Sequence, residues 1–275
     1  MSRVLVALDD SSGFTNSITH FAHGFYDSPE KQCFVGLLAQ NIAYAEPRVS
    51  KLLVQEKKKN LLSPGDKQKV DALAGFRRSI SEAGLSYEVH NNLSLDARGI
   101  INQSHFADLL MLSYQAGFQF VTEDQDSSVL YSILKEARCP VLLLPDDFQG
   151  IDNVVFAYDG KDSSIYAIRE FTQLYGKRLR DKEVTILTID PTAEAEIAHE
   201  KLILGYLQHH YSNVGVKRLT ADDTSEEIYR FSSSLQNPVV VMGAYGRSHL
   251  SHLMAPSVAK NIIFKKSLPL FIAHR

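Results

Sequence analysis

The chain has 275 residues, of which 44% are hydrophobic and 22% are charged, and its formal net charge is −3. These values are typical of a globular protein, and they exclude a disordered tail, a collagen-like fibre and a coiled coil. At roughly 150 residues per domain, the length corresponds to two domains or to one large α/β domain. Acidic residues slightly outnumber basic ones, so the charge gives no reason to expect binding to nucleic acid or to an anionic membrane.

Short apolar runs without polar alternation predict buried strands. In chain order these runs are 4–8, 33–39, 109–113, 141–145, 154–158, 184–189, 239–243 and 269–273. Between them lie stretches of helical period at 14–25, 49–83, 164–178, 193–211, 224–235 and 256–264, the second with a break expected near residues 63–65. Strands that alternate with helices predict right-handed crossovers and a parallel sheet covered on both faces.

The cysteines and the start of the chain bear on the cellular compartment. Cys33 and Cys139 lie far apart in separate apolar runs, which predicts two buried, reduced thiols rather than a disulfide or a metal site. Met1-Ser2-Arg3 leads directly into an apolar run that is too short for a signal sequence. No apolar stretch approaches the roughly 18 residues of a membrane span. We therefore expect a cytoplasmic protein.

The two halves of the chain repeat one another, which is the decisive feature of the sequence. Residues 4–9 (VLVALD) match residues 154–159 (VVFAYD), and a second match without gaps aligns the ends of the two halves. In that second match Pro140 stands opposite Pro269. Each half then has five strands that alternate with helices, and its third strand is expected at 85–90 or 214–219.

We expect the boundary between the halves in the polar stretch that follows residue 145. The predicted domains are therefore residues 1–147 and residues 148–275. The first half is the longer one, mostly because of additional residues between its second and third strands, within 46–71.

A glycine-containing loop follows the fourth strand of the second half. Gly243, Gly246 and Arg247 lie in it, and a helix is expected from about residue 256. Glycines let the backbone approach a ligand closely, a helix N-terminus attracts phosphate, and arginine adds charge-assisted hydrogen bonds. In an open α/β sheet such a ligand binds beyond the carboxyl ends of the strands, where the strand order reverses. A tight turn before a proline-initiated helix explains the same residues without a ligand.

At these residues the chain resembles the universal stress protein family in its tandem-domain form, over essentially all of both halves. The resemblance rests on Asp9-Asp10-Ser11-Ser12 and Asp159-Gly160 after each first strand, and on the run VVVMGAYGRSHLSHLMAPSVAKNI. It implies two tandem domains, each an open five-stranded parallel sheet with helices on both faces. This α/β fold is adenine nucleotide alpha hydrolase-like, or Rossmann-like. The resemblance also implies that the two domains pair through their last strands.

Nucleotide-binding members of the family carry Gly-x2-Gly-x9-Gly-Ser/Thr after the fourth strand, with the aspartate of the first strand near the adenosine. Carried over position by position, the resemblance implies that Ala157, Asp159 and Thr188 flank the base and ribose. The residues around the phosphates are then Met242, Gly243, Gly246, Arg247, Ser257 and Val258. Pro256 replaces the third glycine and has no N–H to offer a phosphate, although proline is favourable in the first helical turn. The implied ligand is ATP or a related nucleotide, with Mg²⁺ only as its companion.

The first half departs from this motif. Tyr114 is aligned with the first glycine and Gly117 with the second, and the acidic run 122–126 (TEDQD) lies beyond them. Each of its three carboxylates opposes a bound phosphate by about 1 kcal/mol at solvent-exposed distances. We therefore expect no nucleotide in the first half, which serves as a pseudo-symmetric partner of the second.

Other candidate sites have simpler explanations. The histidines at 209, 210, 249 and 252 have no carboxylate or thiolate at zinc-like spacing, so we expect no metal site. Asp9-Asp10 and Asp222-Asp223 fit turn and capping roles better than acid–base catalysis. Neither a nucleophile elbow nor a Walker motif is present, which favours binding over turnover and gives no catalytic residue.

The leading hypothesis is a non-catalytic, cytoplasmic stress-response protein whose second domain binds ATP or a similar nucleotide as a sensor or switch. One alternative is a structural or interaction protein that has lost nucleotide binding, and another is a weak ATPase. The expected partners are a nucleotide and a protein that the sequence does not identify, without nucleic acid or membrane. The halves form an intrachain pseudo-dimer, and a homodimer of the whole chain stays open.

Overall fold

The computed structural model describes residues 2–8, 12–26, 32–38, 64–89, 97–114, 129–190, 199–243, 255–265 and 267–274. Both cysteines are free and buried, as predicted, and burial raises the pKa of the Cys139 thiol to about 12. No helix within these residues is both long enough and apolar enough to cross a membrane.

The strands and helices alternate along the chain. The first half contains β1 (Ser2–Leu8), α1 (Ser12–Phe25), β2 (Gln32–Leu38), α3 (Pro64–Glu82), β3 (Ser86–Val89), α4 (Ala97–Ser104), β4 (Leu109–Ser113), α6 (Val129–Glu136) and β5 (Val141–Leu144). The second half contains β6 (Asn153–Ala157), α7 (Asp162–Tyr175), β7 (Glu183–Ile189), α8 (Glu200–His210), β8 (Asn213–Leu219), α9 (Thr224–Ser233), β9 (Pro238–Gly243), α10 (Ala255–Lys265) and β10 (Leu270–Ala273).

One predicted helix has a clear chemical start. The helical period over 49–83 was expected to break near residues 63–65, and α3 begins at Pro64. Proline suits the first helical position because its fixed φ fits the helix and the N–H that it lacks would have no acceptor there. Residues 39–63, which hold the earlier part of that stretch, lie outside the described residues.

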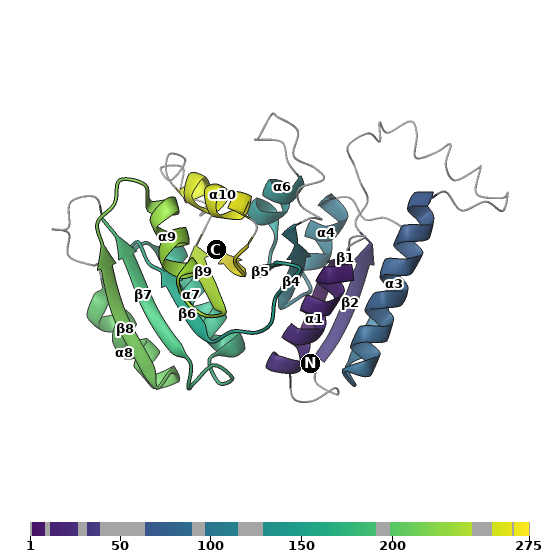
Figure 1. The fold of residues 1–275 in the computed structure, drawn as a ribbon, viewed down its shortest axis with the longest axis horizontal. Helices are drawn as coiled ribbons and strands as arrows, with labels where there is room; N and C mark the ends of the chain where they lie inside the picture. The colour runs from purple at the N-terminus through teal and green to yellow at the C-terminus, as the bar shows by residue number, and fades with distance from the viewer. Residues whose placement is uncertain are drawn as a thin grey trace.

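The strands form one ten-stranded sheet in the order β3-β2-β1-β4-β5-β10-β9-β6-β7-β8. The pairs within each half are parallel, so the two predicted five-stranded parallel sets are present, each with the same order. They join through an antiparallel pair in which Phe271 of β10 lies opposite Leu142 of β5. The pairing of the last strands that the family resemblance implied is therefore confirmed, and it makes the two sets one continuous sheet across the middle of the molecule (Figure 1).

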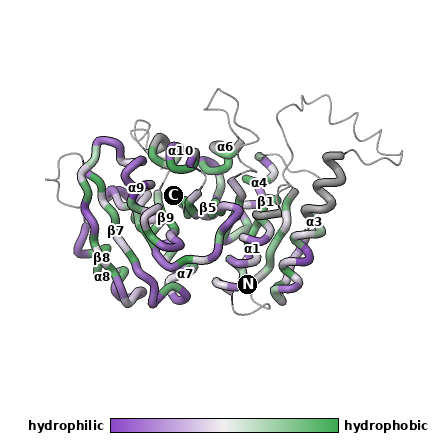
Figure 2. Tube along the Cα trace, in the orientation of Figure 1, coloured by the Kyte–Doolittle hydropathy of each residue, from purple (hydrophilic) through white to green (hydrophobic). Residues whose placement is uncertain are grey.

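Helices cover both faces of this sheet. Val4 and Val6 of β1 pack on the face that carries α1, α3, α7 and α8, whereas Leu5 and Ala7 pack on the face that carries α4, α6, α9 and α10. Strands buried on both sides must be apolar at every position. This requirement explains the uninterrupted apolar runs in the sequence, which appear as hydrophobic stretches along the central strands in Figure 2.

Aromatic side chains join the two halves on the α1 and α7 face. The ring of Tyr175, at the end of α7, lies 5.5 Å from that of Phe21 and 5.1 Å from that of Phe25, both on α1. Phe171 of α7 in turn packs 5.1 Å from Phe271 of β10. Edge-to-face pairs of this kind stabilise by about 0.5–1.5 kcal/mol beyond the burial of their area. The halves therefore share one core.

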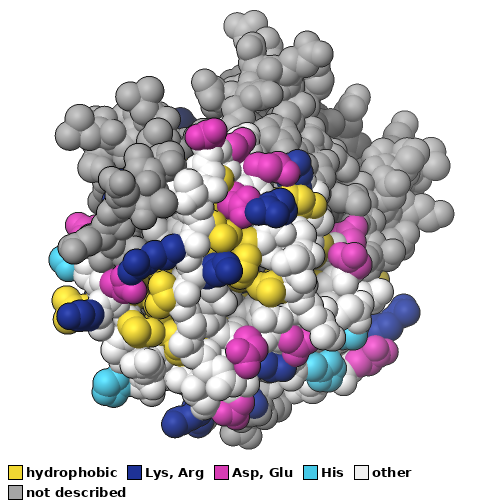
Figure 3. All heavy atoms as spheres, turned by 60° about the vertical axis from the view of Figure 1, so that its left-hand side comes forward, with side chains coloured by type: hydrophobic (Ala, Val, Ile, Leu, Met, Phe, Trp, Pro, Cys, Tyr) yellow, Lys and Arg dark blue, Asp and Glu magenta, His cyan; other side chains and the backbone are white. Residues whose placement is uncertain are grey.

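The surface of the second half mixes charges of both signs. In the face drawn in Figure 3, Lys and Arg side chains alternate with Asp and Glu around scattered apolar side chains. The described part of this face has no large field of a single sign.

Candidate functional site

The strand order reverses once within each half. In the second half, β7 and β8 follow β6 on one side, whereas β9 and β10 lie on the other, so the reversal falls between β6 and β9. Ala157 at the end of β6 lies beside Met242 of β9 on one side and beside Leu187 of β7 on the other. Ligands of open α/β sheets bind at such a point, beyond the carboxyl ends of the strands. The sequence predicts its candidate residues at this edge.

Asp159 follows β6 at this edge and is held by Lys161. Its Oδ1 accepts a hydrogen bond of 3.1 Å from the backbone N–H of Lys161, and its Oδ2 lies 3.2 Å from the Lys161 Nζ. The Asp159 side chain is 48% exposed and the Lys161 side chain is 58% exposed. An ion pair this exposed stabilises by about 0–1 kcal/mol, so an incoming ligand can displace either partner.

Gly243 ends β9, and the first turn of α7 packs directly against it. A Cβ atom at this position would lie 2.2 Å from the backbone carbonyl carbon of Ser163 and 2.5 Å from the backbone nitrogen of Ser164. Only glycine permits so close an approach of backbone. This glycine therefore has a packing reason within the chain, in addition to the ligand contact that the sequence predicts.

Thr188 supplies an unsatisfied polar group near the end of β7. Its Oγ1 is buried and has no hydrogen-bond partner. Leaving such a group unpaired costs about 1–3 kcal/mol, and nearly all buried polar groups have a partner. Two other hydroxyls of the described residues share this state, those of Tyr175 and Ser232, but they lie in helices near their C-terminal ends.

The helix α10 begins close to where the sequence predicts it. Pro256 lies in its first turn, where proline removes no intrahelical hydrogen bond. Val258 is half-buried, and the backbone of Ser257 lies in the same first turn. Gly246 and Arg247 lie outside the described residues, as does the side chain of Ser257.

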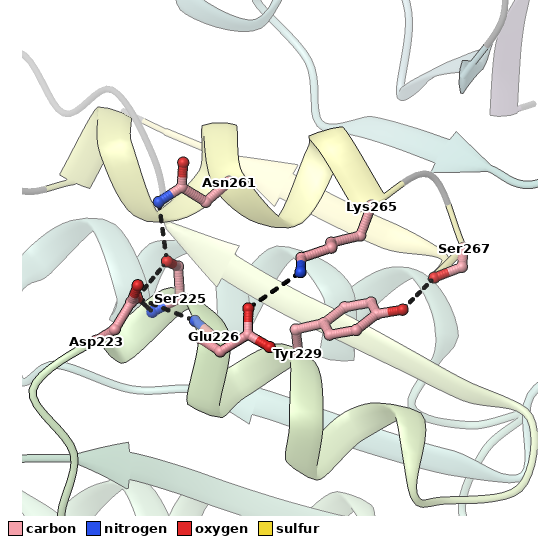
Figure 4. Close-up of polar contacts among 7 residues, drawn as sticks. All are labelled: Asp223, Ser225, Glu226, Tyr229, Asn261, Lys265 and Ser267. Atoms are coloured by element: carbon pink, nitrogen blue, oxygen red, sulfur yellow. Dashed lines mark hydrogen bonds and ion pairs between the residues drawn. The ribbon is translucent and has the colours of Figure 1, made fainter.

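Polar contacts fix α10 against α9 (Figure 4). Asn261 of α10 donates a hydrogen bond of 3.0 Å to the Ser225 hydroxyl, which donates one of 2.5 Å to the Asp223 carboxylate. Further along, the Lys265 Nζ lies 3.1 Å from the Glu226 carboxylate. These contacts hold the helix whose first turn contains the candidate phosphate positions.

Asp223 has the capping role that the sequence favoured. Its carboxylate accepts hydrogen bonds from the backbone N–H groups of Ser225 and Glu226, at the N-terminus of α9. These bonds, with the one from the Ser225 hydroxyl first among them, lower the pKa of Asp223. Among the residues that the structure describes, no three His, Cys, Asp or Glu side chains gather as a metal site.

No family model matches the chain. It is 30% identical over 146 residues to Universal stress protein Slr1230 of Synechocystis, a match that covers 50% of this chain and 47% of that protein. The chain therefore spans about half the length of this curated relative. The fold matches that of a universal stress protein from Archaeoglobus fulgidus with a TM-score of 0.69 at 14% identity, over 100% of this chain and 98% of that one.

The chain is thus similar in sequence to a universal stress protein over half of its length, and in fold to another over its whole length. A second structure, of a Pseudomonas aeruginosa protein, matches with a TM-score of 0.54 at 12% identity, over 100% of this chain and 93% of that one. At these identities the two structural matches show the fold alone. They agree with the open α/β fold that the sequence resemblance implied.

The register of the first half corrects the alignment of the family's glycine position. The backbone N–H of Leu110 bonds to the carbonyl of Pro140, and that of Val240 bonds to the carbonyl of Pro269. Leu110 thus corresponds to Val240, and the first half has one extra residue between these two points. The residue that corresponds to Gly243 is therefore Ser113, and not Tyr114 as the ungapped alignment predicted.

Tyr114 has a different role. Its side chain is buried, and its hydroxyl donates a hydrogen bond of 2.5 Å to the backbone carbonyl of Leu268, just before β10. The residue that follows β4 thus connects the first half to the second.

Two polar residues near the site were missed by the sequence analysis. Lys161 could have been noticed because it stands two residues after the family aspartate, at the start of a helix. Asn261 gave no signal of its own, because its partner Ser225 lies on another helix and only tertiary packing brings them together.

Proposed function

We propose that the protein is a non-catalytic, cytoplasmic stress-response protein whose second half binds ATP or a related adenine nucleotide and acts as a sensor or switch. The carrying observation is the buried, unpartnered Thr188 hydroxyl near the end of β7, next to the point where the strand order reverses. A ribose or base offers polar atoms that satisfy such a group, so occupancy would remove an existing penalty.

The proposed ligand site keeps the residues that the family resemblance implied. Ala157, Asp159 and Thr188 flank the base and ribose in this proposal, and Met242, Gly243, Gly246, Arg247, Ser257 and Val258 surround the phosphates. In support, β6 lies between β7 and β9 in the sheet, and the carboxyl ends of these three parallel strands lie at the same edge. We propose Mg²⁺ only as a companion of the nucleotide.

The sensor role in this proposal follows from the loop between β9 and α10. A bound nucleotide would contact residues on both sides of that loop, and ligands that do so act as switches in other proteins. A protein partner would then distinguish the ligand-bound form from the free one. We also propose that residues 1–147 and 148–275 are the two domains, with only the second one binding the ligand.

Calorimetric titration with ATP tests the proposal. We expect heat of binding with the wild-type protein, and weaker binding after Thr188→Val, which replaces the hydroxyl by a methyl group of similar size. The same change should leave the free energy of unfolding unchanged or raise it by up to about 1 kcal/mol, because an unpaired buried group is removed.

Thr185→Val is the matched control, since Thr185 lies in the middle of the same strand opposite Val155. It should leave ATP binding unchanged. Absence of heat with the wild-type protein at millimolar ATP would contradict the proposal. Equal loss of binding in both variants would show that the effect comes from β7 as a whole.

A second candidate function is an interaction protein without a nucleotide. Two observations favour it: Pro256 offers no N–H in the first turn of α10, and Gly243 is explained by the packing of α7. Absorbance at 260 nm in the denatured extract of the purified protein discriminates the two functions, because a retained nucleotide argues for the first. A slow ATPase ranks below both, and turnover that disappears after Asp159→Asn would support it.

A further inference from the structure

We propose that Lys161 is a phosphate-binding residue of the second half, and that it exchanges Asp159 for the ligand's phosphate when the nucleotide binds. This inference rests on the proposed function and adds to it the chemical class of the ligand: a phosphorylated nucleotide rather than a free nucleoside.

The position of Lys161 is set by the packing of α7. Lys161 is the N-cap of that helix, and its extended backbone precedes the turn that contacts Gly243. Because the Ser163 carbonyl group leaves no room for a Cβ at residue 243, the start of α7 cannot move toward β9. The lysine backbone is therefore anchored between Asp159, on the ribose side of the proposed site, and the end of β9, on the phosphate side.

The side chain is free to change partners. Its ammonium lies 3.2 Å from the Asp159 Oδ2, and both side chains are about half exposed. Such a pair holds by about 0–1 kcal/mol, whereas a hydrogen bond between an ammonium and a phosphate is charge-assisted and stronger. The long, flexible stem of lysine lets the ammonium turn from one acceptor to the other without movement of the backbone.

The local charge balance favours such a cation. Asp159 and Asp162 lie at the start of α7, and Asp190 follows β7 at the same edge of the sheet. These carboxylates oppose a phosphate. Pro256 removes one backbone donor from the first turn of α10. Among the described residues at this edge, Lys161 can offset both effects, whereas Arg218 near the end of β8 is paired with Glu200.

The first half offers a natural contrast. Residue 11, which corresponds to residue 161 because β1 and β6 match residue by residue, is serine. Asp9 is kept there, so the aspartate is present in both halves but the lysine only in the second. At this sequence position a cation is thus present only in the half for which we propose a ligand.

Binding of ATP and of adenosine to Lys161→Met and Lys161→Arg tests this assignment by calorimetry. We expect Lys161→Met to weaken ATP binding about tenfold, the equivalent of one charge-assisted hydrogen bond. Adenosine, which has no phosphate, should bind equally to the variant and the wild type. Lys161→Arg should bind ATP within about twofold of the wild type, because the charge is kept.

Lys177→Met is the control, since Lys177 is an exposed lysine beyond the other end of α7. It should change neither affinity. Equal weakening of ATP and adenosine binding by Lys161→Met would overturn the assignment, and so would unchanged ATP binding. If the wild-type protein binds neither ligand, the proposed function fails as well. If the wild type binds ATP and only the lysine effect is missing, the proposed function stands alone.

Discussion

The two halves of the molecule have the same strand order but differ at the point where that order reverses. In the second half this point contains Gly243, against which α7 packs, and Thr188 with its unpaired hydroxyl. The first half has Ser113 and Leu38 at the corresponding positions of the sheet. A side chain at 113 and an apolar residue at 38 need no ligand to satisfy them. The two halves thus share one scaffold, whereas the residues at the reversal point differ.

At the junction between the halves, where β5 pairs with β10 and α1 contacts α7, corresponding residues pack against each other. Phe21 and Phe25 of α1 correspond to Phe171 and Tyr175 of α7, and the two sets pack together across the junction. Tyr114 has no such counterpart and adds a hydrogen bond from the first half to the second. Residues of the first half therefore pack in the same hydrophobic core as residues of the second half.

The largest expected effect tests whether the halves depend on one another. Tyr175→Ala removes a fully buried ring from the aromatic cluster at the junction, and we expect it to lower the free energy of unfolding by about 4 kcal/mol. Urea unfolding, followed both by circular dichroism and by tyrosine fluorescence, should show a single transition. Phe25→Ala, at the corresponding position of α1, should act similarly. Two separate transitions would show that the halves fold independently.

The next largest effect distinguishes the second half from the first at the point where the strand order reverses. Gly243→Ala places a Cβ against the Ser163 carbonyl group, and we expect a loss of about 3 kcal/mol from overpacking. Ser113→Ala, at the corresponding position, should lower stability by only about 1 kcal/mol through the loss of its hydroxyl. Chemical denaturation of both variants measures the difference. Equal effects would mean that the two positions are not equivalent in packing.

A smaller effect is expected at the connection through Tyr114. Tyr114→Phe removes the hydrogen bond to the Leu268 carbonyl and should reduce the free energy of unfolding by about 1 kcal/mol. Tyr87→Phe is a suitable control because Tyr87 is 40% exposed on the edge strand β3. Thermal unfolding reports both changes. A neutral Tyr114→Phe would show that the ring alone holds this contact.

The smallest effect concerns acid stability at the amino edge of the second half. Hydrogen bonds from Lys182 and Asn237 lower the pKa of Asp152 below its ordinary 3.8. A lowered folded-state pKa contributes stability above the unfolded value, and this contribution is lost as the pH falls through the folded-state pKa. Asp152→Asn should therefore destabilise slightly at pH 7, by less than about 1 kcal/mol because the pair is exposed. The difference from the wild type should shrink as the pH falls below 3.8 and vanish below the folded-state pKa, as denaturation at several pH values would show.

Much of the site could be placed from the sequence, but its register could not. The aspartate after the first strand and the glycine after the fourth were located because each follows an apolar run. The ungapped alignment nevertheless placed Tyr114 opposite Gly243. The extra residue of the first half does not interrupt the apolar run of β4. Because neighbouring positions of that run, such as Leu112 and Ser113, are all buried, the run alone does not show which of them corresponds to Gly243. The hydrogen bonds of Leu110 and Val240 reveal the extra residue.

The sequence by itself determined the alternation of strands and helices, the duplication and the parallel sets, because these depend on the period of apolar residues along the chain. Only the tertiary structure decided that the sets form one sheet through β5 and β10, that α7 leaves room for nothing but glycine at residue 243, and that the Thr188 hydroxyl has no partner. These features arise from atoms far apart in the chain that meet at distances of a few ångströms, and no local pattern encodes such distances.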